Sequence, residues 1–152
     1  MIAEDKQFCT FTLDSLLFGV EVRDVQEVIR YQHITYVPRA AQSVHGLINL
    51  RGQIVTAIDL RSRLKLNKRP ADRQPMNVVI RSGDDVVSML VDEIGDVVSV
   101  DETTFEKPPD TLDGVARSLI RGAYKLENRL LLNLDTEKNI KLYDQDLSSA
   151  WQ

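Results

Sequence analysis

The 152-residue chain has few of the residues that usually carry covalent or metal chemistry. Its only cysteine is Cys9, so no disulfide can form within the chain. Its only histidines, His33 and His45, have no cysteine or second histidine at the spacing of a metal site. The glycine-rich phosphate-loop motif and the Gly-x-Ser-x-Gly turn of serine hydrolases are both missing from the sequence. We therefore expect no catalytic residues, no metal site and no cofactor, and a protein that is not an enzyme.

Long apolar segments and an excess of positive charge are also missing. No apolar run approaches the roughly 20 residues needed to span a bilayer, and the N-terminal residues lack the apolar stretch of a secretory signal. The formal net charge is −4, which argues against general binding to the phosphate backbone of nucleic acids. We expect a cytoplasmic protein that does not insert into membranes and has no nucleic acid partner.

One segment departs from this acidic average. Between residues 61 and 73, six basic side chains are opposed by Asp72 alone. We interpret the proline-containing stretch from Lys65 to Pro75 as a solvated surface linker. The alternative is a surface that binds nucleic acid or an acidic partner, although the stretch lacks interleaved aromatics for base stacking. The basic residues are Arg61, Arg63, Lys65, Lys68, Arg69 and Arg73.

Most of the chain alternates short apolar runs with turn residues, a pattern typical of a mostly β fold. Four hairpins are predicted, each around a short turn of polar residues or glycine. The predicted turns are Asp14-Ser15, Arg51-Gly52, Ser82-Gly83-Asp84-Asp85 and Glu127-Asn128.

A few segments show other patterns. Val22, Val25, Val28 and Ile29 are spaced at helical period, so Arg23 to Ile29 is predicted to be a short helix. A helical turn is expected to begin at Leu60, and the tail from Thr136 is expected to begin as a helix. A further strand is predicted at residues 34–37, ending before Pro38.

Two parts of the chain resemble each other. The stretch from Val44 to Asp59 can be laid without a gap on Ile120 to Asp135, 76 residues later (122 − 46). A weaker match lays residues 20–28 on residues 89–97, at an offset of 69 (89 − 20). The chain is therefore predicted to contain two copies of one β unit, each about the size of a small five-stranded barrel.

Several segments resemble the CheW-like domain family. The most specific is His45-Gly46-Leu47-Ile48-Asn49-Leu50-Arg51-Gly52-Gln53-Ile54-Val55, followed by Ile58-Asp59-Leu60-Arg61. The segments Phe18-Gly19-Val20 and Val25-Gln26-Glu27-Val28 precede it, and the resemblance spans about residues 7–142. It implies a mostly β fold of two five-stranded SH3-like β-barrels that pack together, with short helices. The barrels are expected at about residues 14–75 and 76–146, and strands could be exchanged between them.

The same resemblance implies an adaptor function. Members of the family couple the cytoplasmic tip of chemoreceptors (methyl-accepting chemotaxis proteins) to the regulatory domain of a chemotaxis histidine kinase, and so control kinase activity. Valines would form an apolar floor for a receptor helix, a glycine would allow close backbone approach, and two charged residues would flank the site. Carried over by position, the receptor-binding residues are Val25, Glu27, Gly46, Arg51, Val78 and Val79.

Some alternatives stay open at this level. Arg51 could organise the receptor groove internally instead of touching the receptor. The residues that contact the kinase are not assigned. The chain could also serve as a scaffold in a non-flagellar chemosensory pathway, or, in a different class, as a small barrel that binds nucleic acid through the basic residues 61–73.

Overall fold

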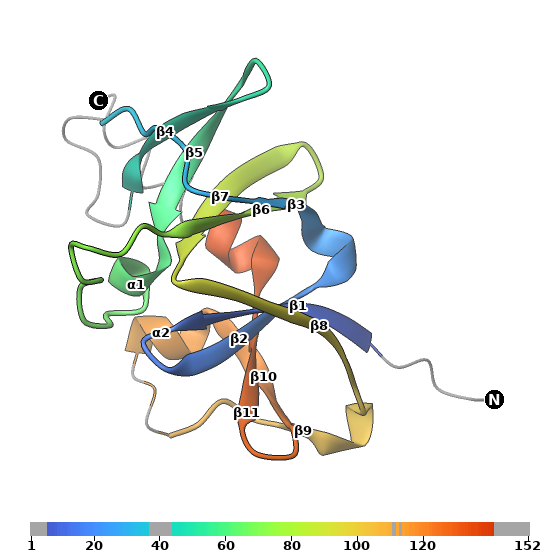
Figure 1. Cartoon of the computed structure of the whole chain (residues 1–152). Coiled ribbons are helices and arrows are strands. Elements are labelled where there is room, and N and C mark those ends of the chain that lie inside the picture. The colour runs from blue at the N-terminus through green and yellow to red at the C-terminus, as the bar shows by residue number, and fades with distance from the viewer. Residues whose placement is uncertain (1–5, 37–43, 111, 113, 142–152) are drawn as a thin grey trace.

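The computed structural model describes residues 6–36, 44–110, 112 and 114–141, which form two twisted β-sheets and a few short helices (Figure 1). The five-stranded sheet occupies the upper half of Figure 1 and the six-stranded sheet the lower half. No helix in this described part of the chain is both long and apolar enough to cross a membrane. The expected mostly β class with short helices is confirmed.

The six-stranded sheet has the strand order β8-β1-β2-β11-β10-β9. All neighbouring strands in it are antiparallel except β2 and β11, which run parallel. The chain therefore brings its first and last strands together in one sheet. Its strands are β1 (Lys6–Leu13), β2 (Leu16–Glu21), β8 (Glu93–Val100), β9 (Phe105–Glu106), β10 (Ile120–Lys125) and β11 (Leu130–Leu134).

The five-stranded sheet has the order β3-β6-β7-β5-β4, with one parallel pair, β5 and β7. It is built from the middle of the chain. Its strands are β3 (Val25–Ile29), β4 (Val44–Leu50), β5 (Gln53–Asp59), β6 (Met76–Ser82) and β7 (Asp85–Val91). The helical elements of the chain are η1 (Val22–Asp24), α1 (Leu60–Arg63), η2 (Glu102–Thr104), α2 (Gly114–Ser118) and a helix at residues 136–141.

The four predicted hairpins are all present, because their turn residues suit the backbone that each turn needs. Asp14 and Ser15 have φ values of 47° and 70°, as the tight turn between β1 and β2 requires. Arg51 and Gly52 have φ values of 53° and 88° in the turn between β4 and β5. Glycine adopts this left-handed region freely, while arginine does so at a cost.

The predicted helix from Arg23 to Ile29 is wrong. Residues Val22–Asp24 form one turn of 3-10 helix, and Val25–Ile29 then continue as strand β3. A three-residue turn followed by alternating strand positions gives the same apolar spacing as an α-helix, while the β-branched residues favour the strand. As a result Glu27, between two outward-facing neighbours, points to the partly buried side of β3.

Other predicted elements hold with changes. The helical turn at Leu60 is α1, and the tail begins as the helix at 136–141. The strand expected at 34–37 is reduced to one bridge between Thr35 and Leu47, and residue 37 lies outside the described residues. Helix α2 was not predicted, since only five residues form it within a segment interpreted as loop.

The two copies of the repeat are visible in the strand register. The β4–β5 ladder shifts by one residue between Val44 and Gly46, and the β10–β11 ladder shifts between Ile120 and Gly122, 76 residues later (122 − 46). Each glycine lies where another segment passes closely. A Cβ on Gly46 would lie 2.3 Å from Thr35 O, and one on Gly122 would lie 2.5 Å from Glu106 O.

The copies exchange their first hairpins. Phe11 pairs with Ile94 between β1 and β8, and Val25 pairs with Ile80 between β3 and β6; both 94 − 25 and 80 − 11 equal 69. Hairpin β1–β2 thus joins the later strands, and hairpin β6–β7 joins the earlier ones. Where one barrel ends and the next begins, at about residues 14–75 and 76–146, stays a prediction.

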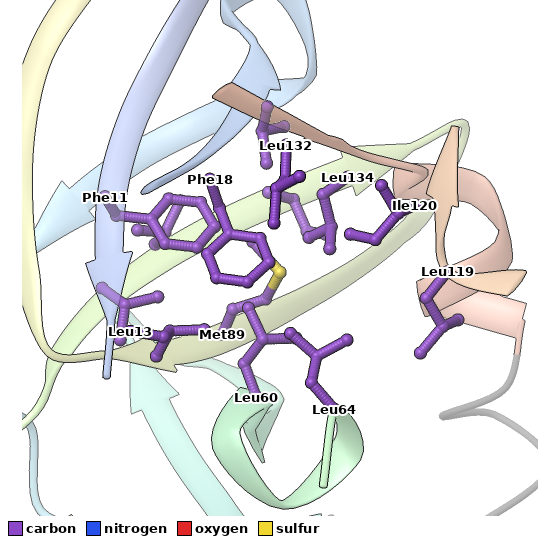
Figure 2. Packing of buried hydrophobic residues seen from close by; sticks show 14 of the residues in the cluster. Phe11, Leu13, Phe18, Leu60, Leu64, Met89, Leu119, Ile120, Leu132 and Leu134 are labelled. Carbon is purple, nitrogen blue, oxygen red and sulfur yellow. The ribbon is translucent and has the colours of Figure 1, made fainter. Parts of the chain in front are cut away.

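The largest apolar cluster lies between the two sheets (Figure 2). Phe11 and Phe18 stack with their ring centroids 5.8 Å apart and lie close to Met89 of β7 in Figure 2. Each of these side chains is at most 1% exposed, so burying it contributes about 1.5–3 kcal/mol. Two smaller clusters lie within the individual sheets, one around Ile48 and Val79 and one around Phe8 and Tyr124. The sheets therefore share a core and are expected to move as one body.

Candidate functional site

The structure joins two of the predicted receptor-binding residues, Glu27 and Arg51. Arg51 Nη2 lies 2.9 Å from Glu27 Oε2, and the Arg51 side chain is 81% exposed while that of Glu27 is only 15% exposed. The turn that presents Arg51 is closed by Asn49 Oδ1, which accepts a 2.8 Å hydrogen bond from Gly52 N. The ion pair thus has a fixed, half-buried carboxylate and an exposed guanidinium.

This ion pair links opposite ends of one sheet. Glu27 lies on β3 and Arg51 lies in the turn that ends β4, and these strands are the two outer strands of the five-stranded sheet. The sheet therefore curls until its ends approach, as in an SH3-like barrel, although β3 and β4 do not pair directly. Arg51 acts here as a side-chain bridge across the open seam.

The second carboxylate oxygen of Glu27 is exceptional. Glu27 Oε1 is buried and has no hydrogen-bond partner among the described residues. Leaving such an acceptor unsatisfied costs about 1–3 kcal/mol, more when it is charged. A donor supplied from outside, by water or by a bound protein, would therefore be stabilising at this position.

The predicted valines lie beside this pair, in the interior of the protein. Val79 is the cross-strand partner of Glu27, and Val78 is that of Val28. Val78 is 1% exposed and Val79 is 0% exposed, and Val25 packs partly buried against the central cluster. Their side chains support the surface from within, and direct contact between them and a receptor stays a prediction.

Gly46 is covered by the chain itself. A Cβ at this residue would meet Thr35 O at 2.3 Å and Ile34 Cγ2 at 2.5 Å. The close approach that glycine allows is therefore made by residues 34–35, which bridge to Leu47. Gly46 positions the hairpin that carries Arg51, and its direct contact with a receptor also stays a prediction.

Exposed apolar residues near the ion pair were not predicted from the sequence. Ile54, on the same hairpin as Arg51, is 62% exposed, and Val28, next to Glu27 on β3, is 39% exposed. Strand alternation in β5 places Val55 inside and so Ile54 outside, which is a signal that the sequence contains. These residues give the neighbourhood of the ion pair the apolar surface that the buried valines do not.

The interpretation of residues 65–75 as a solvated linker is wrong for one arginine, and the neighbouring Arg61 is also buried. The side chains of Arg61 and Arg69 are only 6% and 9% exposed, and both pair with Asp92, itself 4% exposed. Arg61 donates to both carboxylate oxygens, Arg69 Nε donates to Oδ1 at 2.9 Å, and Asp14 N donates to Oδ2 at 2.9 Å. Asp92 therefore ties the β1–β2 turn, α1 and the loop after α1 together.

The electrostatics of Asp92 follow from this geometry. Burial alone would raise the pKa of the Asp92 carboxyl group. The hydrogen bonds from Arg61, from the Asp14 backbone and from Arg69 outweigh burial and lower that pKa below its ordinary value. The same bond raises the pKa of Arg61, so the pair stays charged. Asp92 is thus engaged by protein donors, which makes it unsuitable as a cation ligand.

Comparison with known proteins agrees with this architecture. Residues 7–143 match a family model described as the CheW-like domain. The chain is 31% identical to a chemotaxis protein CheW of Bacillus subtilis over 134 residues, covering 88% of this chain and 86% of that protein. It is 30% identical to a chemotaxis protein CheW of Klebsiella aerogenes over 133 residues, covering 88% and 80% respectively. The crystal structure of the scaffolding protein TtCheW from Thermoanaerobacter tengcongensis superposes with a TM-score of 0.78 at 26% identity, covering 87% of this chain and 90% of that one.

Proposed function

The chain belongs to the CheW-like domain family, and on this premise we propose that it is a scaffold that couples chemoreceptors to a chemotaxis histidine kinase. An adaptor of this kind acts by binding, without catalysis. Its receptor surface would meet the cytoplasmic tip of the receptor, and another surface would meet the regulatory domain of the kinase. The protein would then work in the cytoplasm and join membrane receptor arrays only through these partners.

The Glu27–Arg51 ion pair is the observation that supports the receptor surface best. An exposed guanidinium held by a half-buried carboxylate presents remaining N–H donors in a defined direction. The unsatisfied Glu27 Oε1 can accept a donor from the partner. Ile54 and Val28 add apolar contact area for one face of an amphipathic helix.

The shared core supports the coupling step. A scaffold transmits the position of one partner to another only if its surfaces keep a fixed relation. The apolar cluster between the sheets and the Asp92 network provide that rigidity. Modest affinities at each surface would become strong binding when many receptors and kinases are held in an array.

Receptor binding is tested by sedimenting the protein with membranes that contain a cognate chemoreceptor, without kinase. We expect Arg51→Glu to weaken binding at least about tenfold, because the new carboxylate repels Glu27 and removes the donors. Arg129→Glu is the matched control, since the exposed Arg129 lies at the corresponding β10–β11 hairpin of the other repeat copy. A folded Arg51→Glu variant that binds like the wild type would remove Arg51 from the receptor surface.

A further inference from the structure

A pocket of about 660 Å³ opens beside α1, on the side of the loop formed by residues 64–75. The loop is the green segment that follows α1 in Figure 1. Tyr31 and His45 form part of the lining. A volume of this size is typical of sites that hold a small molecule. The pocket is separate from Glu27 and Arg51, which are not part of its lining.

The charge of this pocket is opposite in sign to that of the whole protein. Its described lining contains five basic side chains and one carboxylate, Asp59, while the net charge of the chain is −4. Asp59 is already engaged, because its Oδ1 accepts a 3.1 Å hydrogen bond from Arg61 N at the start of α1. The basic residues are Arg61, Lys65, Lys68, Arg69 and Arg73.

Two of these basic groups are held in place before any ligand arrives. Asp92 lies in the neighbouring pocket and fixes the guanidinium groups of Arg61 and Arg69 from behind. Because these groups are ordered in advance, an anion that meets them loses less affinity to side-chain ordering. Lys65, Lys68 and Arg73 are exposed and provide adjustable charges around them.

The backbone at Lys65 is a second, independent observation. Lys65 has a φ of 58°, in the left-handed region where glycine is preferred after a helix. Its N–H bonds to Ser62 O at 3.2 Å, and the next N–H bonds to Arg61 O at 2.8 Å, which closes the end of α1. A lysine is thus kept at a position that suits glycine better, and its side chain lines the cationic pocket.

The remaining lining suits a flat, partly apolar body. Tyr31 is 38% exposed, and Leu66, Pro70 and Pro75 contribute apolar surface. An exposed aromatic ring can stack on a base or another planar group. We propose that this pocket binds a phosphate-bearing small molecule of nucleotide size, with its phosphates at the basic side chains and its planar part at Tyr31.

The test uses the full-length protein and isothermal titration calorimetry with three probes: ATP, inorganic pyrophosphate and adenosine. We expect saturable binding of ATP, weaker binding of pyrophosphate and none of adenosine. Binding of ATP should also weaken as salt is raised, since it depends on charge. Neither receptor nor kinase is needed, so the outcome is independent of the adaptor function.

The variants are chosen so that loss of binding cannot be confused with unfolding. Lys65→Gly removes a pocket charge at a position where glycine fits the backbone, so its melting temperature should equal or exceed that of the wild type. We expect Lys65→Gly and Lys68→Ala each to weaken ATP binding at least fivefold. The exposed Lys107, outside the pocket, supplies the control Lys107→Ala, which should bind as the wild type does.

Three results would overturn the proposal. The first is that neither ATP nor pyrophosphate shows saturable binding. The second is that ATP binds equally well to the wild type, Lys65→Gly and Lys68→Ala. The third is that a single-stranded oligonucleotide binds while ATP does not, which would assign the surface to a nucleic acid polymer.

Discussion

Arg69 Nε donates a 2.9 Å hydrogen bond to Asp92 Oδ1, although 23 residues separate the two along the chain. The same carboxylate also receives Arg61 and the backbone N–H of Asp14. One buried acidic group therefore connects the hairpin of one sheet with the helix and loop that follow a strand of the other. The fixed relation between the two sheets depends on this group as well as on the apolar core.

Replacing Asp92 by asparagine is expected to destabilise the fold by about 3–5 kcal/mol, because two nearly buried guanidinium groups lose their counter-charge. Equilibrium unfolding in urea measures the change. The adjacent Glu93 has a side chain that is 68% exposed, so Glu93→Gln should change stability by no more than about 0.5 kcal/mol. Equal midpoints for the wild type and Asp92→Asn would show that the network is dispensable.

The pH dependence of stability follows from the lowered pKa of Asp92. A carboxyl group with a depressed folded pKa adds stability that is complete above its unfolded pKa of about 3.9. That contribution is lost as the pH falls below this value, through the folded pKa. Urea midpoints measured from pH 6 downward should thus fall more steeply for the wild type than for Asp92→Asn below about pH 4. Parallel curves would mean that Asp92 does not contribute.

Gly46→Ala is expected to destabilise the protein by about 1–3 kcal/mol, since the new Cβ would lie 2.3 Å from a backbone oxygen. It should also weaken receptor binding, because residues 34–35 and the Arg51 hairpin must shift apart. Gly114→Ala in α2 is the control, as nothing lies within 4 Å of a Cβ there and alanine favours the helix. If Gly46→Ala matched Gly114→Ala in both stability and binding, the close approach would not matter.

Exchanging the charges of the ion pair separates binding from folding. Arg51 is 81% exposed, so Arg51→Ala should cost less than about 1 kcal/mol of stability while receptor binding falls strongly. The double variant Glu27→Arg with Arg51→Glu restores an opposite-charge pair and should recover stability without recovering binding. Recovered receptor binding in the double variant would mean that the pair acts only by closing the barrel.

The sequence predicts some parts of this site and not others, for physical reasons. The hairpin that carries Arg51 is encoded locally, by a turn between two alternating strands. The strand position of Glu27 was missed because a 3-10 turn before β3 imitates helical spacing. The partnership of Arg69 with Asp92 depends on which segments meet in space, and spacing along a single chain does not contain that information.

The adaptor function is tested most directly by the autophosphorylation rate of the cognate histidine kinase in membranes that carry the chemoreceptor, with and without this protein. We expect a strong rise only when receptor, kinase and protein are all present, and little or no rise when Arg51→Glu replaces the wild type. A kinase rate that is the same with and without the folded wild-type protein would contradict the proposed coupling.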